Sequence, residues 1–215
     1  MDENSLRLTE IFYSLQGESS TVGQPTAFIR LTGCPLRCQY CDTAYAFRGG
    51  KWFSLETILS KVADFGARYV CVTGGEPLAQ PKAIELLRAL CDTGYYVSLE
   101  TSGALDISAV DSRVMIVMDL KTPGSGEEGK NLLTNLDYLK PTDEIKFVLS
   151  HREDYDWAAK MIKNYQLTDR AKVLFSPSWH ELNPQTLADW IVHDKIQVRF
   201  QMQLHKILWH DLPGH

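Results

Sequence analysis

Short apolar segments alternate with amphipathic segments along most of the chain, and this alternation constrains the fold more than any other feature. The apolar segments are rich in β-branched and aromatic residues, and several are apolar throughout, which is typical of strands covered on both faces. The amphipathic segments have the apolar spacing of helices, with capping residues near their ends. The expected strands are residues 26–32, 69–74, 95–101, 114–121, 144–150, 172–177 and 196–203, and the expected helices are residues 54–66, 81–94, 152–167 and 183–194.

Such alternation predicts a mostly parallel α/β fold. A complete eight-unit barrel needs about 250 residues, whereas this chain of 215 residues offers about six strand–helix units. We therefore expect an incomplete (β/α)6-type partial TIM barrel with a mostly parallel sheet. Because residues 1–215 contain no repeat and no long linker, we expect a single domain, with a cysteine loop at about 34–43 and a C-terminal tail at about 203–215.

The composition narrows the class of protein. Hydrophobic residues make up 44% of the chain and charged residues 23%, which is ordinary for a soluble globular protein. The net charge of −5 argues against a general nucleic-acid binder. No targeting segment opens the sequence, and the longest apolar run is too short to span a membrane. With five cysteines, an odd number, and no export signal, we expect a cytoplasmic protein whose thiols stay reduced.

Polar or glycine-rich motifs follow nearly every expected strand. In a parallel barrel the carboxyl ends of the strands share one rim, and ligands bind at that rim. The sequence therefore predicts a single site built from all of these motifs. They are the cysteine loop, TGGEP (73–77), ETSG (100–103), DLK (119–121), SPSW (176–179) and QLHK (203–206).

Three cysteines, Cys34, Cys38 and Cys41, lie within eight residues in a C-x3-C-x2-C pattern. This spacing allows one short loop to place three thiolates around a small metal core. Three thiolates on a cubane iron–sulfur cluster would leave one iron open to an outside ligand. Two other interpretations remain open at this point, namely three ordinary reduced cysteines and a zinc site with a distant histidine as the fourth ligand.

The loop, with Tyr40 directly before Cys41, resembles the radical S-adenosylmethionine (SAM) superfamily. The resemblance implies a [4Fe–4S] cluster whose open iron binds the amino and carboxylate groups of SAM. In that superfamily an electron from the cluster cleaves SAM to give a 5′-deoxyadenosyl radical. The implied SAM-binding residues are Tyr40, Asp42, Gly75, Glu76, Ser102, Asp119, Leu120, Lys121 and Ser176.

Some of these residues have simpler interpretations. Two adjacent glycines at the end of a strand often form a plain turn, and Ser102 has the residue type of a helix N-cap. Related enzymes often have Ser-Pro-Lys where this chain has Asp119, Leu120 and Lys121. Only the lysine is kept, so the resemblance supports the first two residues less as side-chain contacts than as backbone contacts.

A narrower resemblance comes from SLQGE (14–18), FIRL (28–31), CDT (41–43) and QMQLHK (201–206), which are together similar to the 7-carboxy-7-deazaguanine synthases. That family converts 6-carboxy-5,6,7,8-tetrahydropterin into 7-carboxy-7-deazaguanine, with loss of ammonia, in queuosine and 7-deazapurine biosynthesis. The resemblance implies Mg²⁺ bound at Thr43, a flavodoxin or ferredoxin as reductant, and a homodimer. The implied substrate-binding residues are Leu15, Gln16, Gly17, Glu18, Arg30, Thr73 and His205. Simpler interpretations stay open for some of them: a loop turn at 16–17, a surface ion pair for Arg30 and a hydrogen-bonded structural role for His205.

Two alternative functions stay open on the sequence alone. A glycyl-radical activating enzyme would share the cysteine loop and GGEP, but it has no need for SLQGE. A zinc-stabilised binding module would need only the cysteines and a histidine. Cys71 and Cys91 are expected to be buried inert thiols, and Trp179 a core or interface residue. Some family members end on a proline that contacts substrate, but this chain continues past Pro213, whose role is left unassigned.

Overall fold

The computed structural model describes residues 5–210, 212 and 214. Within these residues, nine strands form one sheet in the order β3-β1-β2-β4-β5-β6-β7-β8-β9. β1 pairs antiparallel with β2 and with β3, and every pair from β2 to β9 is parallel. The strands are β1 (Ser5–Leu15), β2 (Pro25–Leu31), β3 (Lys51–Ser54), β4 (Tyr69–Gly74), β5 (Tyr96–Thr101), β6 (Met115–Asp119), β7 (Glu144–Leu149), β8 (Lys172–Pro177) and β9 (Arg199–Phe200).

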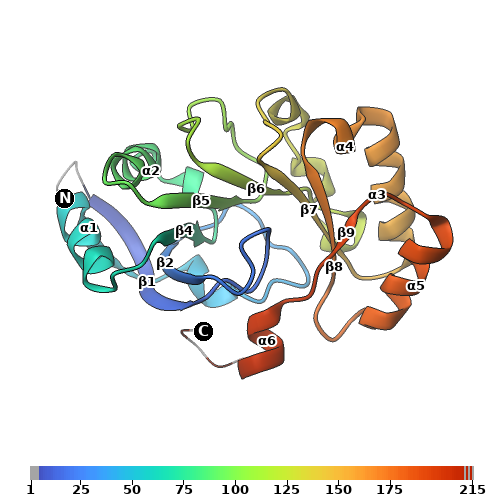
Figure 1. Cartoon of the computed structure of the whole chain (residues 1–215), viewed down its shortest axis with the longest axis horizontal. Helices are drawn as coiled ribbons and strands as arrows, with labels where there is room; N and C mark the ends of the chain where they lie inside the picture. Colours follow the sequence, from blue (N-terminus) through green and yellow to red (C-terminus); the bar gives the residue numbers. More distant parts are fainter. Residues whose placement is uncertain (1–4, 211, 213, 215) are drawn as a thin grey trace.

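Helices flank the curved sheet along its length (Figure 1). α1 and α2 pack beside its first half, and α3, α4 and α5 beside its second half. The α-helices in the described part of the chain are α1 (Leu55–Asp64), α2 (Ala83–Asp92), α3 (Arg152–Tyr165), α4 (Leu167–Arg170), α5 (Pro184–Asp194) and α6 (Leu204–Trp209). No helix in the described part of the chain has both the length and the apolar character needed to cross a bilayer.

The expected fold class is confirmed: a mostly parallel sheet with flanking helices forms a partial barrel. All seven expected strands and all four expected helices are present. The strand expected at residues 196–203 is shortened to the two residues of β9. β1 and β3 were not expected, and they add an antiparallel edge before the first parallel strand.

Local capping and apolar spacing explain the helices. Ser54 caps α1 by accepting a hydrogen bond from the Thr57 N–H, and Ile58 and Val62 lie one turn apart on the buried face. In α2, Leu86 and Leu90 have the same spacing and are fully buried. These faces pack against the strands as one of two apolar clusters, while the second surrounds β6, β7 and β8. Packing of the helices against the strands therefore stabilises the sheet.

Residues 16–24 connect β1 to β2 and reach the far strands of the sheet. The backbone N–H of Ser20 donates to the carboxylate of Glu144, at the start of β7, at 2.9 Å. The N–H of Ser19 donates to the side-chain oxygen of Gln201, just after β9, at 2.6 Å. This loop and the C-terminal segment at 201–206 therefore connect the two sides of the incomplete barrel. In a complete barrel, further strands close this gap.

Candidate active site

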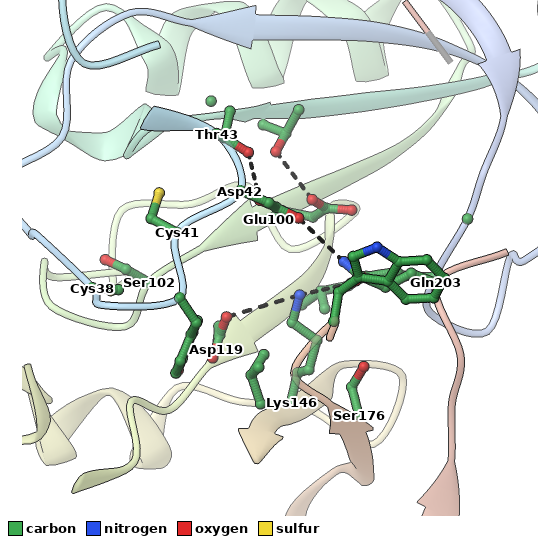
Figure 2. A pocket seen from close by; sticks show the side chains of 18 of the residues that line it. Cys38, Cys41, Asp42, Thr43, Glu100, Ser102, Asp119, Lys146, Ser176 and Gln203 are labelled. Carbon is green, nitrogen blue, oxygen red and sulfur yellow. Dashed lines mark hydrogen bonds and ion pairs between the residues drawn. The ribbon is translucent and has the colours of Figure 1, made fainter. Parts of the chain in front are cut away.

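A cavity of about 510 Å³ lies at the carboxyl ends of the parallel strands (Figure 2). Side chains from the cysteine loop, from the ends of β4 to β8 and from the C-terminal segment face into it. The structure brings together nearly all of the predicted site residues. Those that line the cavity are Leu15, Gln16, Gly17, Glu18, Arg30, Cys34, Cys38, Tyr40, Cys41, Asp42, Thr43, Thr73, Gly75, Ser102, Asp119, Lys121, Ser176 and His205.

The three cysteines lie on the loop that follows β2, and each is partly exposed to the cavity. Backbone contacts fix the path of this loop. The N–H of Gln39 donates to the carbonyl oxygen of Ser125 at 3.0 Å, and the guanidinium of Arg37 donates to the carbonyl oxygen of Cys34 at 2.8 Å. The thiols are therefore presented by an ordered loop, as a metal cluster requires.

Two opposing effects act on the pKa of the three thiols, and the charge of Lys121 is the one that favours the thiolate form that a cluster binds. Burial raises the pKa of Cys34, Cys38 and Cys41, and the nearby Lys121 ammonium opposes this rise at each of them. Among the described residues, no three His, Cys, Asp or Glu side chains converge on one metal ion. A cubane does not need such convergence, because each thiolate binds a different iron. The donor set therefore fits a [4Fe–4S] cluster with one open iron.

Gly75 allows the end of β4 to pass directly against the cysteine loop. A β-carbon at this position would lie 2.3 Å from the carbonyl oxygen of Gly33 and 2.8 Å from the β-carbon of Cys34. The N–H of Glu76 donates to the same Gly33 carbonyl at 2.8 Å. The glycine is therefore required by close backbone approach, beyond any contact with a ligand.

Two predicted cofactor residues, Glu76 and Leu120, do not line the cavity. The Glu76 carboxylate is fully buried and accepts hydrogen bonds from the Ser102 N–H at 2.7 Å and from the Thr101 hydroxyl at 3.0 Å. Leu120 is fully buried in the apolar core. In this structure Glu76 orients Ser102, which does face the cavity, because the protein itself satisfies the carboxylate.

Charged side chains line the wall beside the cysteine loop. The ammonium of Lys121 pairs with Asp119 at 2.9 Å, and that of Lys146 lies 3.8 Å from the same carboxylate oxygen. Burial raises the pKa of Tyr40, and the Asp119 charge adds to that rise. Ser176 completes this wall at the end of β8. The wall offers hydrogen-bond donors and acceptors suited to a polar cofactor.

A hydrogen-bonded group occupies the opposite part of the cavity. Thr73 donates its hydroxyl proton to one oxygen of Glu100 at 3.0 Å, and the Gln16 amide approaches the other oxygen at 3.4 Å. These residues come from β4, from β5 and from the loop after β1. Glu100 is a cavity carboxylate that the sequence analysis did not single out.

Arg30 points into the cavity from β2. Its Nε donates to Glu10 at 2.7 Å, and its guanidinium lies 5.8 Å from the ring centres of Phe12 and Tyr45. Burial opposes the charge, but Tyr45 and Glu10 outweigh it, so the pKa of Arg30 is raised. Arg30 is therefore a fixed cation at the cavity wall, and the planar fork of a guanidinium suits a carboxylate ligand.

His205 packs directly on Gly17. A β-carbon at Gly17 would lie 2.0 Å from Nδ1 of His205, and the backbone N–H of Leu204 donates to the Gly17 carbonyl at 2.9 Å. Burial lowers the pKa of His205, so the imidazole is neutral near pH 7. The SLQGE segment and the C-terminal segment therefore form one continuous wall.

Thr43 and Asp42 lie where the cysteine loop meets the C-terminal segment. The Thr43 hydroxyl donates to Asp42 at 2.8 Å, and Lys206 pairs with the other carboxylate oxygen at 3.2 Å. The side chain of Asp42 is 45% exposed, and although partial desolvation works against its charge, Lys206 and the Thr43 hydrogen bond lower its pKa to about 2. An ionised carboxylate beside a hydroxyl suits Mg²⁺, which keeps much of its shell as water or ligand oxygen.

Two cavity residues were not predicted, for different reasons. Lys146 is a single polar residue in a strand that otherwise reads as apolar, whereas Glu100 belongs to the ETSG segment, for which only Ser102 was given a role. Trp179, expected in the core or at an interface, lines the cavity. Cys71 and Cys91 are buried free thiols, as expected. Residues 213 and 215 lie outside the described residues.

Comparisons with known proteins agree with this geometry. Residues 28–166 match the Radical SAM superfamily. The chain is 43% identical over 210 residues to the 7-carboxy-7-deazaguanine synthase of Chlorobaculum tepidum, with 96% of both chains covered. It is 37% identical over 209 residues to the 7-carboxy-7-deazaguanine synthase of Thermoplasma acidophilum, with 96% of this chain and 99% of that relative covered. The crystal structure of QueE from Escherichia coli shares the fold, with a TM-score of 0.76 and 23% identity over 94% of this chain and 95% of that chain.

Proposed function

The chain belongs to the 7-carboxy-7-deazaguanine synthase family of the radical SAM superfamily, and on that premise we propose that it converts 6-carboxy-5,6,7,8-tetrahydropterin into 7-carboxy-7-deazaguanine and ammonia. The observation that supports this reaction is the shared cavity. The cysteine loop and the SLQGE segment, which are far apart in sequence from the C-terminal QLHK segment, line one cavity with it. Substrate and product differ by NH₃, so the overall conversion needs no net oxidant or reductant.

Cys34, Cys38 and Cys41 would hold the [4Fe–4S] cluster. When bound together, cluster and SAM would supply a 5′-deoxyadenosyl radical for hydrogen transfer at carbon 6 of the substrate, with SAM used catalytically. The protein's own task is to hold both molecules in one place and to exclude water. For SAM, the cavity offers Tyr40, Asp42, Gly75, Ser102, Asp119, Lys121 and Ser176.

The substrate would occupy the part of the cavity opposite the cysteine loop. Arg30 is the cation placed to pair with the substrate carboxylate. Gln16, Thr73 and Glu100 form a hydrogen-bonded group suited to the polar edge of a pterin ring. His205, held neutral by burial, can donate or accept one hydrogen bond without adding charge.

Mg²⁺ is part of the proposal because Thr43 and the ionised Asp42 border the cavity. A site with so few protein ligands would fill only when substrate oxygens complete the shell of the ion. The physiological electron donor is proposed to be a flavodoxin or ferredoxin, the assembly a homodimer, and the product a precursor of queuosine or another 7-deazapurine.

The reaction is tested by anaerobic incubation of cluster-loaded, reduced protein with SAM, Mg²⁺ and 6-carboxy-5,6,7,8-tetrahydropterin. The expected result is 7-carboxy-7-deazaguanine and ammonia in equal amounts, with 5′-deoxyadenosine far below the amount of product. The Cys38→Ala variant is the control and should give neither product. If 5′-deoxyadenosine accumulates without the deazaguanine, the substrate assignment is wrong, and the glycyl-radical activating alternative becomes the one to test.

A further inference from the structure

Lys146 occupies the middle of β7, where the sheet places it between the two parts of the cavity. Its register partner on β6 is Asp119, and its carbonyl oxygen accepts from the Leu120 N–H at 2.9 Å. Its neighbours Ile145 and Phe147 are fully buried in the core, so Lys146 points to the opposite face of the sheet and lines the cavity. Paired strands, which are more rigid than a loop, set its position.

The ammonium of Lys146 lies between two carboxylates that belong to different parts of the site. Its Nζ is 2.6 Å from Glu18 and 3.8 Å from Asp119 (Figure 2). The three side chains are only 12%, 11% and 15% exposed, respectively, so water screens the charges weakly. Glu18 belongs to the segment proposed to face the substrate, and Asp119 belongs to the wall proposed to face SAM.

Glu18 has a second partner that fixes it further. Its other carboxylate oxygen accepts from the Gln203 amide at 2.8 Å, and the same amide lies 3.3 Å from Asp42. Burial lowers the pKa of Lys146, but the Glu18 and Asp119 charges outweigh burial, and the pKa is raised well above its ordinary value. Without the Lys146 ammonium, the largely buried carboxylates of Glu18 and Asp119 would lose a positive charge that lies close to both, and they would repel each other more strongly.

We propose that Lys146 is a positioning residue, which holds the Glu18 segment against the Asp119 wall and so fixes the substrate at a set place relative to SAM. The inference rests on the proposed function and deepens it, because it names the side chain that joins the two parts of the cavity. Glu18 stands on a loop that must be held, whereas Lys146 stands on a buried strand that already is. Loss of the ammonium therefore removes the ion pair that holds the Glu18 carboxylate, while the backbone contacts of the loop and the strand itself stay in place.

Lys121 provides a matched control. Its ammonium is similarly shielded, at 10% exposure, and it pairs with the same Asp119 oxygen at 2.9 Å. Among the described residues, Asp119 is the one carboxylate with which Lys121 forms an ion pair. Removing Lys121 therefore takes one positive charge from the same wall without releasing Glu18.

The test measures binding without turnover. Cluster-loaded protein without reductant is titrated by calorimetry with SAM and with 6-carboxypterin, the oxidised form of the proposed substrate. We expect Lys146→Met to weaken 6-carboxypterin binding on the order of tenfold or more, with cluster content unchanged. Lys121→Met should weaken SAM binding and keep the affinity for 6-carboxypterin. Lys146→Arg, which retains the cation, should restore part of the loss, and Lys146→Gln serves as the neutral variant if Lys146→Met does not fold.

A double-mutant cycle shows whether Lys146 acts through Glu18. The Lys146→Met/Glu18→Gln variant should bind 6-carboxypterin no more weakly than the weaker single variant. Fully additive losses, or wild-type affinity in the neutral Lys146 variants, would overturn the inference and leave the proposed function standing. A wild-type protein that binds SAM but no 6-carboxypterin would overturn both.

Discussion

The cavity side chains with proposed roles form two groups, those that would hold the metal cluster and those that would bind only the substrate. The three cysteines share one loop and have Lys121 as a common neighbouring charge. Arg30 lies on β2 and is held by Glu10, outside that loop. The two groups of residues therefore have separate supports, and substitutions in them should have separable effects.

This separation predicts opposite results for Cys38→Ala and Arg30→Ala. Cys38→Ala should lose the cluster, because it removes one of three thiolates. Arg30→Ala should keep the cluster and lose about 1.5–3 kcal/mol of substrate binding, because it removes a charge-assisted pair with the carboxylate. Iron and sulfide content, visible absorption and substrate titration measure both effects. An Arg30→Ala variant that binds substrate normally would contradict the role given to the guanidinium.

His205 predicts a pH dependence of stability. Because burial lowers its pKa from the ordinary 6.5, the unfolded chain takes up a proton below that pH before the folded chain does. This residue's contribution to the free energy of unfolding is therefore full above pH 6.5 and declines as the pH falls. Urea unfolding at pH 7.5 and 5.5 should show a larger decline for the wild type than for His205→Gln.

The control for this pH dependence is His151→Gln, because the His151 side chain is exposed. It should decline between pH 7.5 and pH 5.5 as the wild type does. Equal declines in the wild type and His205→Gln would show that the folded chain does not resist protonation of His205.

At the scale of elements, the site depends on the end of β4 lying against the cysteine loop. Gly75→Ala would place a methyl group 2.3 Å from a backbone oxygen of that loop, which cannot rotate away. We expect a loss of about 1–3 kcal/mol of stability and reduced cluster loading. Gly129→Ala is the control, because a β-carbon there meets nothing within 4 Å. Unfolding curves and iron content measure the difference, and similar values for both variants would refute it.

Elements with strong periodic patterns could be predicted from the sequence. The apolar core strands and the four long amphipathic helices were predicted correctly, because burial on one or both faces leaves a clear spacing of apolar residues in the sequence. β1 and β3 form an antiparallel edge whose pattern mixes polar and apolar residues, and tertiary pairing, of β1 with β2 and of β3 with β1, makes them strands. β9 is cut to two residues, although its sequence reads as a longer strand.

The candidate site divides in the same way. Glycines and cysteines at strand ends were found from motif and spacing, and they do line one cavity. Lys146 was not predicted because a lone polar residue in a buried strand reveals its role only when its neighbours across the sheet are known. Glu100 lies in a predicted motif, but its role depends on contacts with Thr73 and Gln16 that are distant in sequence. Glu76 is the opposite case. Its motif is distinctive, but its carboxylate accepts hydrogen bonds from Thr101 and Ser102 and does not line the cavity.

For the molecule as a whole, the incomplete barrel depends on non-strand segments to form its cavity. The loop at 16–24 reaches Glu144 on β7 and Gln201 beyond β9, and the C-terminal segment covers Gly17 with His205. Both segments also carry the residues proposed to face the substrate. The groups proposed for the cofactor and those proposed for the substrate both stand partly on strand ends and partly on loops, and all of them face the same cavity.

The central claim is that SAM and substrate meet in this one cavity, close enough for direct hydrogen transfer. It is tested most directly with 6-carboxy-5,6,7,8-tetrahydropterin that carries deuterium at carbon 6, by mass spectrometry of SAM and 5′-deoxyadenosine recovered during turnover. Direct hydrogen transfer from carbon 6 would place deuterium in the recovered cofactor while the deazaguanine forms. Product formation with an unlabelled cofactor would contradict it.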